Sequence, residues 1–128
     1  AIYLSDNPAT IRKKVMRAVS DSGPTEPNQP KPEPIQNLFT LMSVVSSDET
    51  HQFYNDKYND CEIRYGDMKK QLAEDIITFT EPIRERIEAI LSDNEYLKKV
   101  AKQGAEKARE SASKTVKEVR EIIGFRPF

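Results

Sequence analysis

The sequence predicts an all-α fold, a bundle of five or six helices with a Pro-rich linker after the first helix. Three observations support this. Apolar residues recur at helical spacing through most of the 128 residues. No segment sustains the alternation that is typical of a half-buried strand. Five of the eight prolines fall between Gly23 and Pro34, and this stretch, called the Pro-rich linker below, is expected to be extended and exposed because proline fixes φ and lacks an N–H donor.

The first helix is predicted from Asn7, a favourable N-cap, and Pro8, which suits the first helical position. It is expected to continue to Gly23-Pro24, with an apolar face made of Ile11, Val15, Ala18 and Val19. The preceding residues Ile2 to Leu4 are interpreted as the remnant of a strand.

Two helices are predicted after the linker. The apolar face of the first of them comprises Ile35, Leu38, Phe39, Met42 and Val45. A break follows at Ser46 to Asp48, and a short helix is expected from Glu49 to Lys57 with Phe53 and Tyr54 facing inward.

The most regular helical pattern comes next, with Asp67 as its predicted cap and Pro82 inside it. Its stripe consists of Met68, Leu72, Ile76, Phe79, Ile83, Ile87 and Ile90. Ser92 and Glu95 have the spacing of a capping box for the following helix, and we expect a break at Gly104.

The last helix is predicted to carry a narrow seam of small residues that brings two helices close together. The seam comprises Ala105, Ala108, Ala112, Thr115, Val119 and Ile122. Gly124 is expected to end this helix, with Phe125 folding back as the hydrophobic contact of the cap.

Composition excludes several functional classes. Lys and Arg number 20 and Asp and Glu number 21, so no global positive field attracts nucleic acid, and any RNA contact must come from a local patch. One His and one Cys leave no set for a metal site or for a Ser/His/Asp triad, so we predict neither metal ligands nor catalytic residues in this chain. The single cysteine suits a reducing compartment, and no apolar run is long enough to cross a membrane, so a cytoplasmic location is expected.

Two groups of residues are candidates for RNA contact. Four cations of the first helix, Arg12, Lys13, Lys14 and Arg17, are predicted to contact phosphates, although a merely solvated helix face is an open alternative. Tyr65, Lys69 and Lys70 combine an aromatic ring with positive charge, as readers of single-stranded RNA do. The alternative for Tyr65 is packing into the turn at Gly66.

Several strings, taken in order, make the chain resemble the C-terminal region of the bacterial tryptophanyl-tRNA synthetases, which are class I aminoacyl-tRNA synthetases. They are IYLSDNPATIRKKVMRAVSDSG from Ile2, PIQNLF from Pro34, YGDMKKQLAE from Tyr65, EPIRERI from Glu81, GAEKARESASKT from Gly104, and the final IIGF. The resemblance covers nearly the whole chain.

The resemblance implies that this chain is a helical part of a larger ligase whose Rossmann-type catalytic domain uses ATP and Mg²⁺ to join tryptophan to its tRNA. Residues 1–22 would connect to that domain, 23–34 would form the Pro-rich loop, and 35–128 would bind the anticodon end of tRNA(Trp). By itself the chain is expected to be inactive, and the complete ligase to be a homodimer. Some family members hold an iron–sulfur cluster on cysteines around the positions of Cys61, Tyr65 and Met68, but only the first is cysteine here, so no cluster is expected.

A second hypothesis is a free-standing helical module that binds a protein partner through an apolar stripe and has no catalytic activity. A membrane-surface protein fits poorly, because acidic residues are spread through most of the predicted helices.

Overall fold

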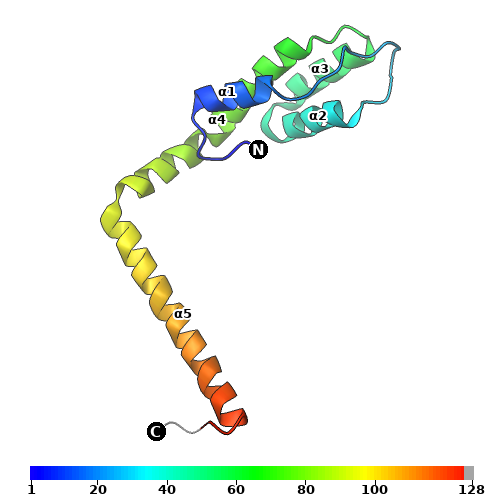
Figure 1. Cartoon of the computed structure of the whole chain (residues 1–128). Coiled ribbons are helices and arrows are strands. Elements are labelled where there is room, and N and C mark those ends of the chain that lie inside the picture. Colours follow the sequence, from blue (N-terminus) through cyan, green and yellow to red (C-terminus); the bar gives the residue numbers. More distant parts are fainter. Residues whose placement is uncertain (126–128) are drawn as a thin grey trace. The chain divides into compact units, whose positions relative to one another are not determined.

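The computed structural model describes residues 1–125, and these contain five α-helices and no strand (Figure 1). The all-α prediction is therefore confirmed. In chain order the helices are α1 (Pro8–Met16), α2 (Glu33–Val45), α3 (Asp48–Asn59), α4 (Tyr65–Ser92) and α5 (Asn94–Ile122). The chain divides into two compact units, Ala1–Glu85 and Arg86–Phe128, which we call the N-terminal and C-terminal units.

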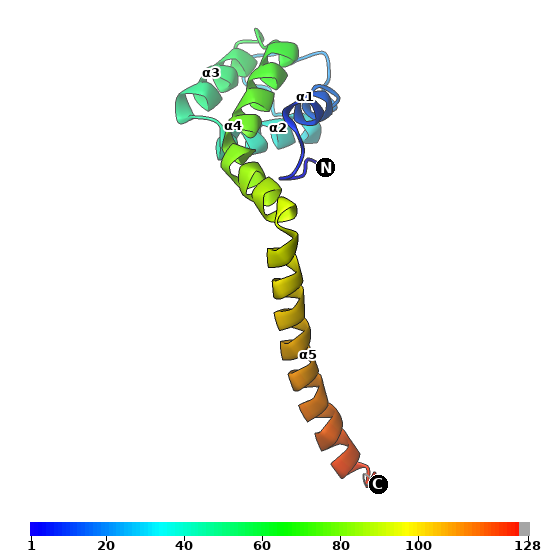
Figure 2. The ribbon, with the colours of Figure 1, turned by 90° about the vertical axis from the view of Figure 1, so that its left-hand side faces the viewer.

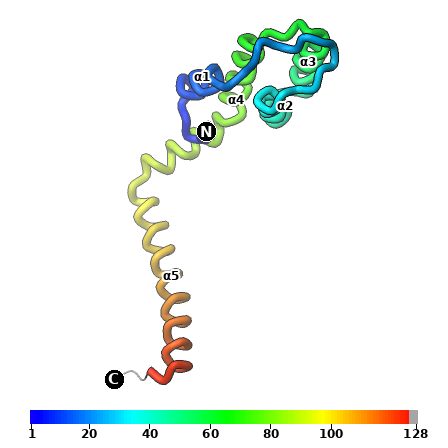
Figure 3. The backbone as a smooth tube through the Cα atoms, turned by 45° about the vertical axis from the view of Figure 1, so that its right-hand side comes forward, coloured from blue at the N-terminus to red at the C-terminus, as the bar shows by residue number. Residues whose placement is uncertain are grey.

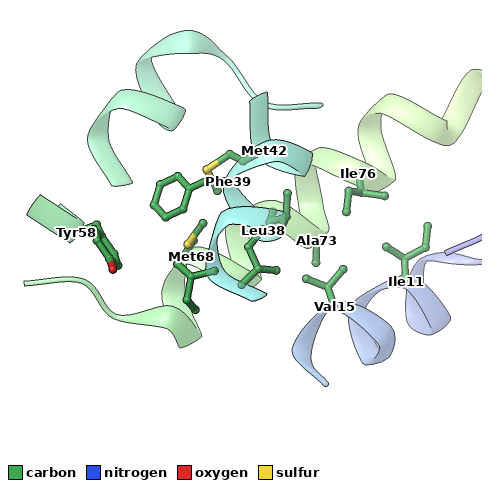
Figure 4. Packing of buried hydrophobic residues seen from close by; sticks show 11 residues of the cluster. Ile11, Val15, Leu38, Phe39, Met42, Tyr58, Met68, Ala73 and Ile76 are labelled. Carbon is green, nitrogen blue, oxygen red and sulfur yellow. The ribbon is translucent and has the colours of Figure 1, made fainter. Parts of the chain in front are cut away.

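A single hydrophobic core lies in the N-terminal unit, where α1, α2 and α3 gather around the first part of α4 (Figure 2). Each of these four helices contributes side chains that are almost completely buried (Figure 4). The core residues are Ile11, Val15, Ile35, Leu38, Phe39, Met42, Tyr58, Met68, Leu72, Ala73 and Ile76. Because burial of one such side chain contributes about 1.5–3 kcal/mol, this cluster is the main stabilising feature of the unit.

Helix α1 begins as predicted but ends earlier. The Asn7 side chain accepts a hydrogen bond from the backbone N–H of Thr10 at 2.8 Å, and Pro8 occupies the first turn. The helix stops at Met16 rather than at Gly23. A physical reason is that the ammonium group of Lys69 binds the carbonyl of Ala18 at 2.7 Å, so this oxygen is used outside a helical ladder.

The segment before α1 is not a strand, so that expectation was wrong. The backbone N–H of Asp6 donates to the carbonyl of Tyr3 at 3.0 Å, and the N–H of Tyr3 donates to the Asp6 carboxylate at 2.8 Å. These two bonds close a turn. Ile2 is partly buried against the core, so its apolar side chain has a partner within the chain.

The Pro-rich linker passes around the N-terminal unit and is fastened to it (Figure 3). The Nζ of Lys31 donates to Asn55 at 2.8 Å and lies 4.7 Å and 4.8 Å from the ring centroids of Phe39 and Tyr58. The N–H of Asn28 donates to the carbonyl of Asn59 at 3.1 Å. Partial burial lowers the pKa of Lys31. The second half of the linker is thus held by cation–π contacts and hydrogen bonds.

Helix α3 lies where it was predicted and extends slightly at both ends. Tyr54 packs against the core, but Phe53 is 54% exposed, so the inward position predicted for Phe53 was wrong. The two side chains point about 100° apart on α3, and only the direction of Tyr54 leads to the core. Their ring centroids lie 5.1 Å apart at an angle of 83°.

Helix α4 begins at Tyr65, so Asp67 lies in its first turn rather than at the predicted cap, and the helix continues through Pro82. The predicted stripe is buried only as far as Ile76, because Phe79 is 49% and Ile83 is 37% exposed. The buried face continues instead through Thr80 and Arg84. Steps of four residues from Ile76 keep these two polar side chains on one ridge of the helix.

Helix α5 is continuous through Gly104, so the predicted break was wrong. Asp93, not Ser92, caps its start, because the Asp93 carboxylate accepts from the N–H of Tyr96 at 2.9 Å. None of its residues is buried, and the small-residue seam therefore meets no partner helix among residues 1–125.

The end of α5 confirms the predicted glycine cap. Gly124 has a φ of 77°, its N–H donates to the carbonyl of Glu121 at 3.2 Å, and the N–H of Phe125 donates to that of Arg120 at 2.8 Å. This pair of bonds is a Schellman motif. Phe125 lines a hollow together with Val116 and other residues near the end of α5, and its side chain is 65% exposed.

Candidate nucleic-acid interface

Helix α1 and the first half of α4 lie side by side, and a bidentate ion pair links their surfaces. Nε of Arg12 donates to Oε1 of Glu74 at 2.6 Å, and Nη2 donates to Oε2 at 3.0 Å. The pair holds the pKa of Glu74 below its usual value and raises the pKa of Arg12. The largest cause of both shifts is the hydrogen bond between the two side chains. Both side chains are about half exposed, so water and salt screen this interaction and a stronger anion can compete for the guanidinium.

Lys14 is directed to the opposite edge of α1. Its Nζ lies 2.5 Å from the Asp6 carboxylate and 4.6 Å from the centroid of the Tyr3 ring. The hydrogen bond from Lys14 is the main reason that the pKa of Asp6 is lowered. Asp6 is largely covered, so this pair is better shielded from solvent than the Arg12 pair.

Lys13 and Arg17 are exposed and make no ion pair with any residue in the range 1–125. Lys13 lies on the face of α1 that is turned away from the buried Ile11 and Val15, whereas Arg17, predicted to be in the helix, is the C-cap residue directly after it. Of the four cations predicted to contact phosphates, these two are therefore accessible and unpaired.

Lys69 lies in the interior rather than at the surface. Only 6% of it is exposed, and its Nζ donates to the Ala18 carbonyl at 2.7 Å and to the Ser20 hydroxyl at 2.8 Å. The two oxygens satisfy a charge that would otherwise be costly to bury. Lys69 thus joins α4 to the chain that leaves α1.

Lys70, the next residue, is 73% exposed along its side chain, and its Nζ lies 4.0 Å from the Asp67 carboxylate. It stands on α4 one helical turn before Glu74, the residue that pairs with Arg12 of α1. We call Arg12, Lys13, Arg17 and Lys70 the cationic surface.

Tyr65 packs against the core, not into a turn at Gly66 as the alternative interpretation had it, because Gly66 lies inside α4. Its hydroxyl oxygen is buried and meets no hydrogen-bond partner at acceptable geometry within residues 1–125. Burial, followed by the nearby Asp21 carboxylate, strongly raises the pKa of Tyr65, so the phenol stays protonated. The ring is not presented as an open stacking face.

Sequence reasoning missed a hollow of about 780 Å³ where α3 is joined to α4. Its lining comprises Phe53, Tyr54, Lys57, Cys61, Glu62, Ile63, Arg64 and Asp67. The adjacent Phe53 and Tyr54 were the available signal, but both were assigned to the core. A periodic pattern indicates an apolar face and does not tell which ring remains at the surface.

The described residues also bear on metal binding and membrane insertion. Within 1–125, no three side chains of His, Cys, Asp or Glu are grouped so that they could hold a metal ion. In that same part of the chain, every helix is too short or too polar to span a bilayer.

Comparison with known proteins shows what the chain is similar to. No family model matches the chain. It is 60% identical over 126 residues to the tryptophan–tRNA ligase of Porphyromonas gingivalis, 42% identical over 126 residues to that of Listeria monocytogenes, and 35% identical over 127 residues to tryptophan–tRNA ligase 1 of Streptomyces coelicolor. Each match covers 98% of this chain but only 38%, 37% and 36% of the respective relative. Along 98% of its length the chain is therefore similar to a segment that makes up a little over a third of these tryptophan–tRNA ligases.

Proposed function

We propose that this chain is the part of a tryptophan–tRNA ligase that holds tRNA(Trp) at its anticodon end. The observation that carries the proposal is the 60% identity to one such ligase over 98% of the chain. A Rossmann-type domain elsewhere in the longer protein would activate tryptophan with ATP and Mg²⁺ and charge the tRNA. The chain alone would be inactive, and the complete ligase would be a cytoplasmic homodimer.

We propose the same division of labour along the chain as the sequence suggested. Residues 1–22 connect to the catalytic domain, 23–34 form the loop, and 35–128 form the tRNA-binding region. Lys69 contributes to the anticodon end by fixing the segment after α1 to α4, and Tyr65 contributes by packing against the core. They are positioning residues in this proposal.

The cationic surface, together with Lys14, supplies the phosphate contacts. Each cation that neutralises a phosphate releases condensed counterions, so affinity falls as salt rises. Lys13 and Arg17 can bind a phosphate without breaking an existing ion pair, because they make none within residues 1–125. Arg12 must leave Glu74, and Lys14 must leave the more covered Asp6, so we rank their contributions in that order.

The test is a titration of the 128-residue chain with the anticodon stem-loop of tRNA(Trp) at salt concentrations between about 50 and 200 mM. The double variant Lys13→Ala/Arg17→Ala should bind about tenfold more weakly at the lowest salt and should lower the slope of log K against log salt by about one to two. Both residues are exposed, so the fold should be kept.

The matched control is Lys13→Arg/Arg17→Lys, which keeps both positive charges at the same exposed positions. Its binding should resemble that of the wild-type chain. Equal affinity and equal salt slope for Lys13→Ala/Arg17→Ala and the wild type would remove the cationic surface from the proposal. Equal binding of a mismatched stem-loop would leave only non-specific attraction.

A protein-interaction module is the second candidate, and one observation favours it. Several apolar residues of the C-terminal unit are exposed, among them Val100, Val116, Val119, Ile122 and Ile123. This candidate requires that the chain binds no RNA hairpin at low salt and that the natural polypeptide is no longer than the chain.

A further inference from the structure

The hollow between α3 and α4 offers an aromatic surface that the core does not use. Phe53 is 54% exposed although it is a large apolar side chain, and it stands edge to face with the partly buried Tyr54. Burial raises the pKa of Tyr54, so its hydroxyl remains a proton donor. One ring of the pair is thus fixed against the core while the other is available for stacking.

The charged groups of the hollow provide both a donor and an acceptor. Lys57 and Glu62 pair with each other at 2.5 Å, which occupies both of them. Arg64 makes no ion pair with the described residues, and Asp67 lies 4.0 Å from its only such partner, Lys70. The guanidinium of Arg64 and the carboxylate of Asp67 therefore line the same hollow as the exposed ring of Phe53.

The wall that carries these groups is fixed by its backbone. Cys61 has a φ of 60°, its N–H donates to the carbonyl of Tyr58 at 3.1 Å, and the N–H of Glu62 donates to that of Lys57 at 2.8 Å. This is the Schellman pattern at the end of α3. The carbonyl of Arg64 accepts from the N–H of Met68 at 3.1 Å, which ties the other side of the hollow to the first turn of α4.

Two other hollows of the N-terminal unit lack this chemistry. One is lined by apolar residues together with Glu33 and Asn37, and the other by apolar residues together with Lys14 and Arg17. Neither includes an aromatic ring, so neither offers a stacking face. The hollow at Phe53 is different because it combines a stacking face with polar groups that are suited to the edge of a flat heterocycle.

We propose that this hollow binds one unpaired nucleobase of the tRNA anticodon loop. Phe53 stacks on the base, the guanidinium of Arg64 donates to its carbonyl or ring-nitrogen acceptors, and the carboxylate of Asp67 accepts from its amino or imino group. The inference rests on the proposed function and adds to it a base-reading position distinct from the phosphate contacts of the cationic surface.

Binding of RNA hairpins by the 128-residue chain tests the proposal. Phe53→Ala should weaken binding of the anticodon stem-loop by about tenfold, within the range of about 5-fold to 150-fold that loss of one stacked base entails. Phe53→Tyr should retain binding, because it keeps the ring. The control Phe79→Ala removes a similarly exposed ring of the same unit that does not line the hollow, and it should bind as the wild type does.

A set of hairpins that each lack one loop base identifies the ligand. One abasic hairpin should bind the wild-type chain as weakly as the intact hairpin binds Phe53→Ala, and combining the two changes should cause little further loss. If Phe53→Ala and Arg64→Ala bind every hairpin like the wild type while the salt dependence persists, the hollow is not a base site and only the cationic surface stands. If the wild-type chain binds no hairpin, the proposed function fails together with this inference.

Cys61 gives a second readout that is confined to the hollow. It is exposed, it lines the hollow, and it is the only cysteine of the chain. The intact hairpin should slow alkylation of this thiol by iodoacetamide several-fold, and the critical abasic hairpin should not. Protection that is equal with both hairpins would contradict the proposal.

Discussion

The two compact units of this chain form helices for different reasons. In the N-terminal unit, eleven side chains from four helices make a common core, whereas α5 buries none of its residues. Yet α5 is well delimited, by the Asp93 cap at its start and the Gly124 motif at its end. The comparison teaches that local signals define where a helix begins and ends, while long-range packing decides what a helix is fixed against.

The largest expected difference between the units concerns core truncation. Leu72→Ala in the N-terminal unit should lower the free energy of unfolding by about 2–5 kcal/mol, because Leu72 is 0% exposed and its loss leaves a cavity. Val119→Ala on α5 should change it by about 0.5 kcal/mol or less, since Val119 is 48% exposed. Hydrogen exchange of individual backbone amides reports the stability of each unit separately. Similar losses of protection for the two variants would contradict the difference between the units.

A smaller effect is expected at the buried lysine. Lys69→Met keeps the aliphatic stem but leaves the Ala18 carbonyl and the Ser20 hydroxyl without their donor, which should cost about 1–3 kcal/mol. The control Lys70→Met changes an exposed neighbour and should stay within about 0.5 kcal/mol of the wild type. Urea unfolding measures both, and a neutral result for Lys69→Met would mean that water replaces the ammonium group without loss.

The smallest effect concerns pH and the Arg12–Glu74 pair. The folded pKa of Glu74 lies below the usual 4.5, so the pair stabilises the fold fully above 4.5, and this stabilisation is lost as pH falls through the folded pKa. Wild-type chain and Glu74→Gln should therefore differ slightly in urea midpoint near neutral pH and converge in acid. Since Glu74→Gln also releases Arg12, it should bind the anticodon stem-loop somewhat more tightly, and weaker binding would argue against Arg12 as a phosphate contact.

Much of the fold could be predicted because its signals are local. The Asn7 and Pro8 start of α1, the extent of α3 and the Gly124 cap each depend on a few neighbouring residues. The break predicted at Gly104 was wrong because it, too, was inferred from one local residue. One glycine costs about 1 kcal/mol in a helix, and the helix formers on both sides outweigh it.

The candidate site was less predictable, because its geometry depends on residues far apart in the sequence. Lys69 is buried because its acceptors, 51 and 49 positions away, fold back onto it. Its exposed neighbour Lys70 has a sequence environment that is almost the same. The sequence therefore indicated the positive charge correctly but could not tell which cations would be buried in contacts within the folded chain.

The Pro-rich linker has a mixed character that follows from where it is attached. From Asn28 to Lys31 it is bound to α2 and α3. The hydrogen bonds of Gly23 and Thr25 within residues 1–125 instead go to residues close in sequence, Asp21 and Gln29. Residues inserted near Thr25 would lengthen an exposed segment without disturbing the contacts of Lys31. The first half of this connection is accordingly the place where sequence length is free to vary, and the second half is where it is not.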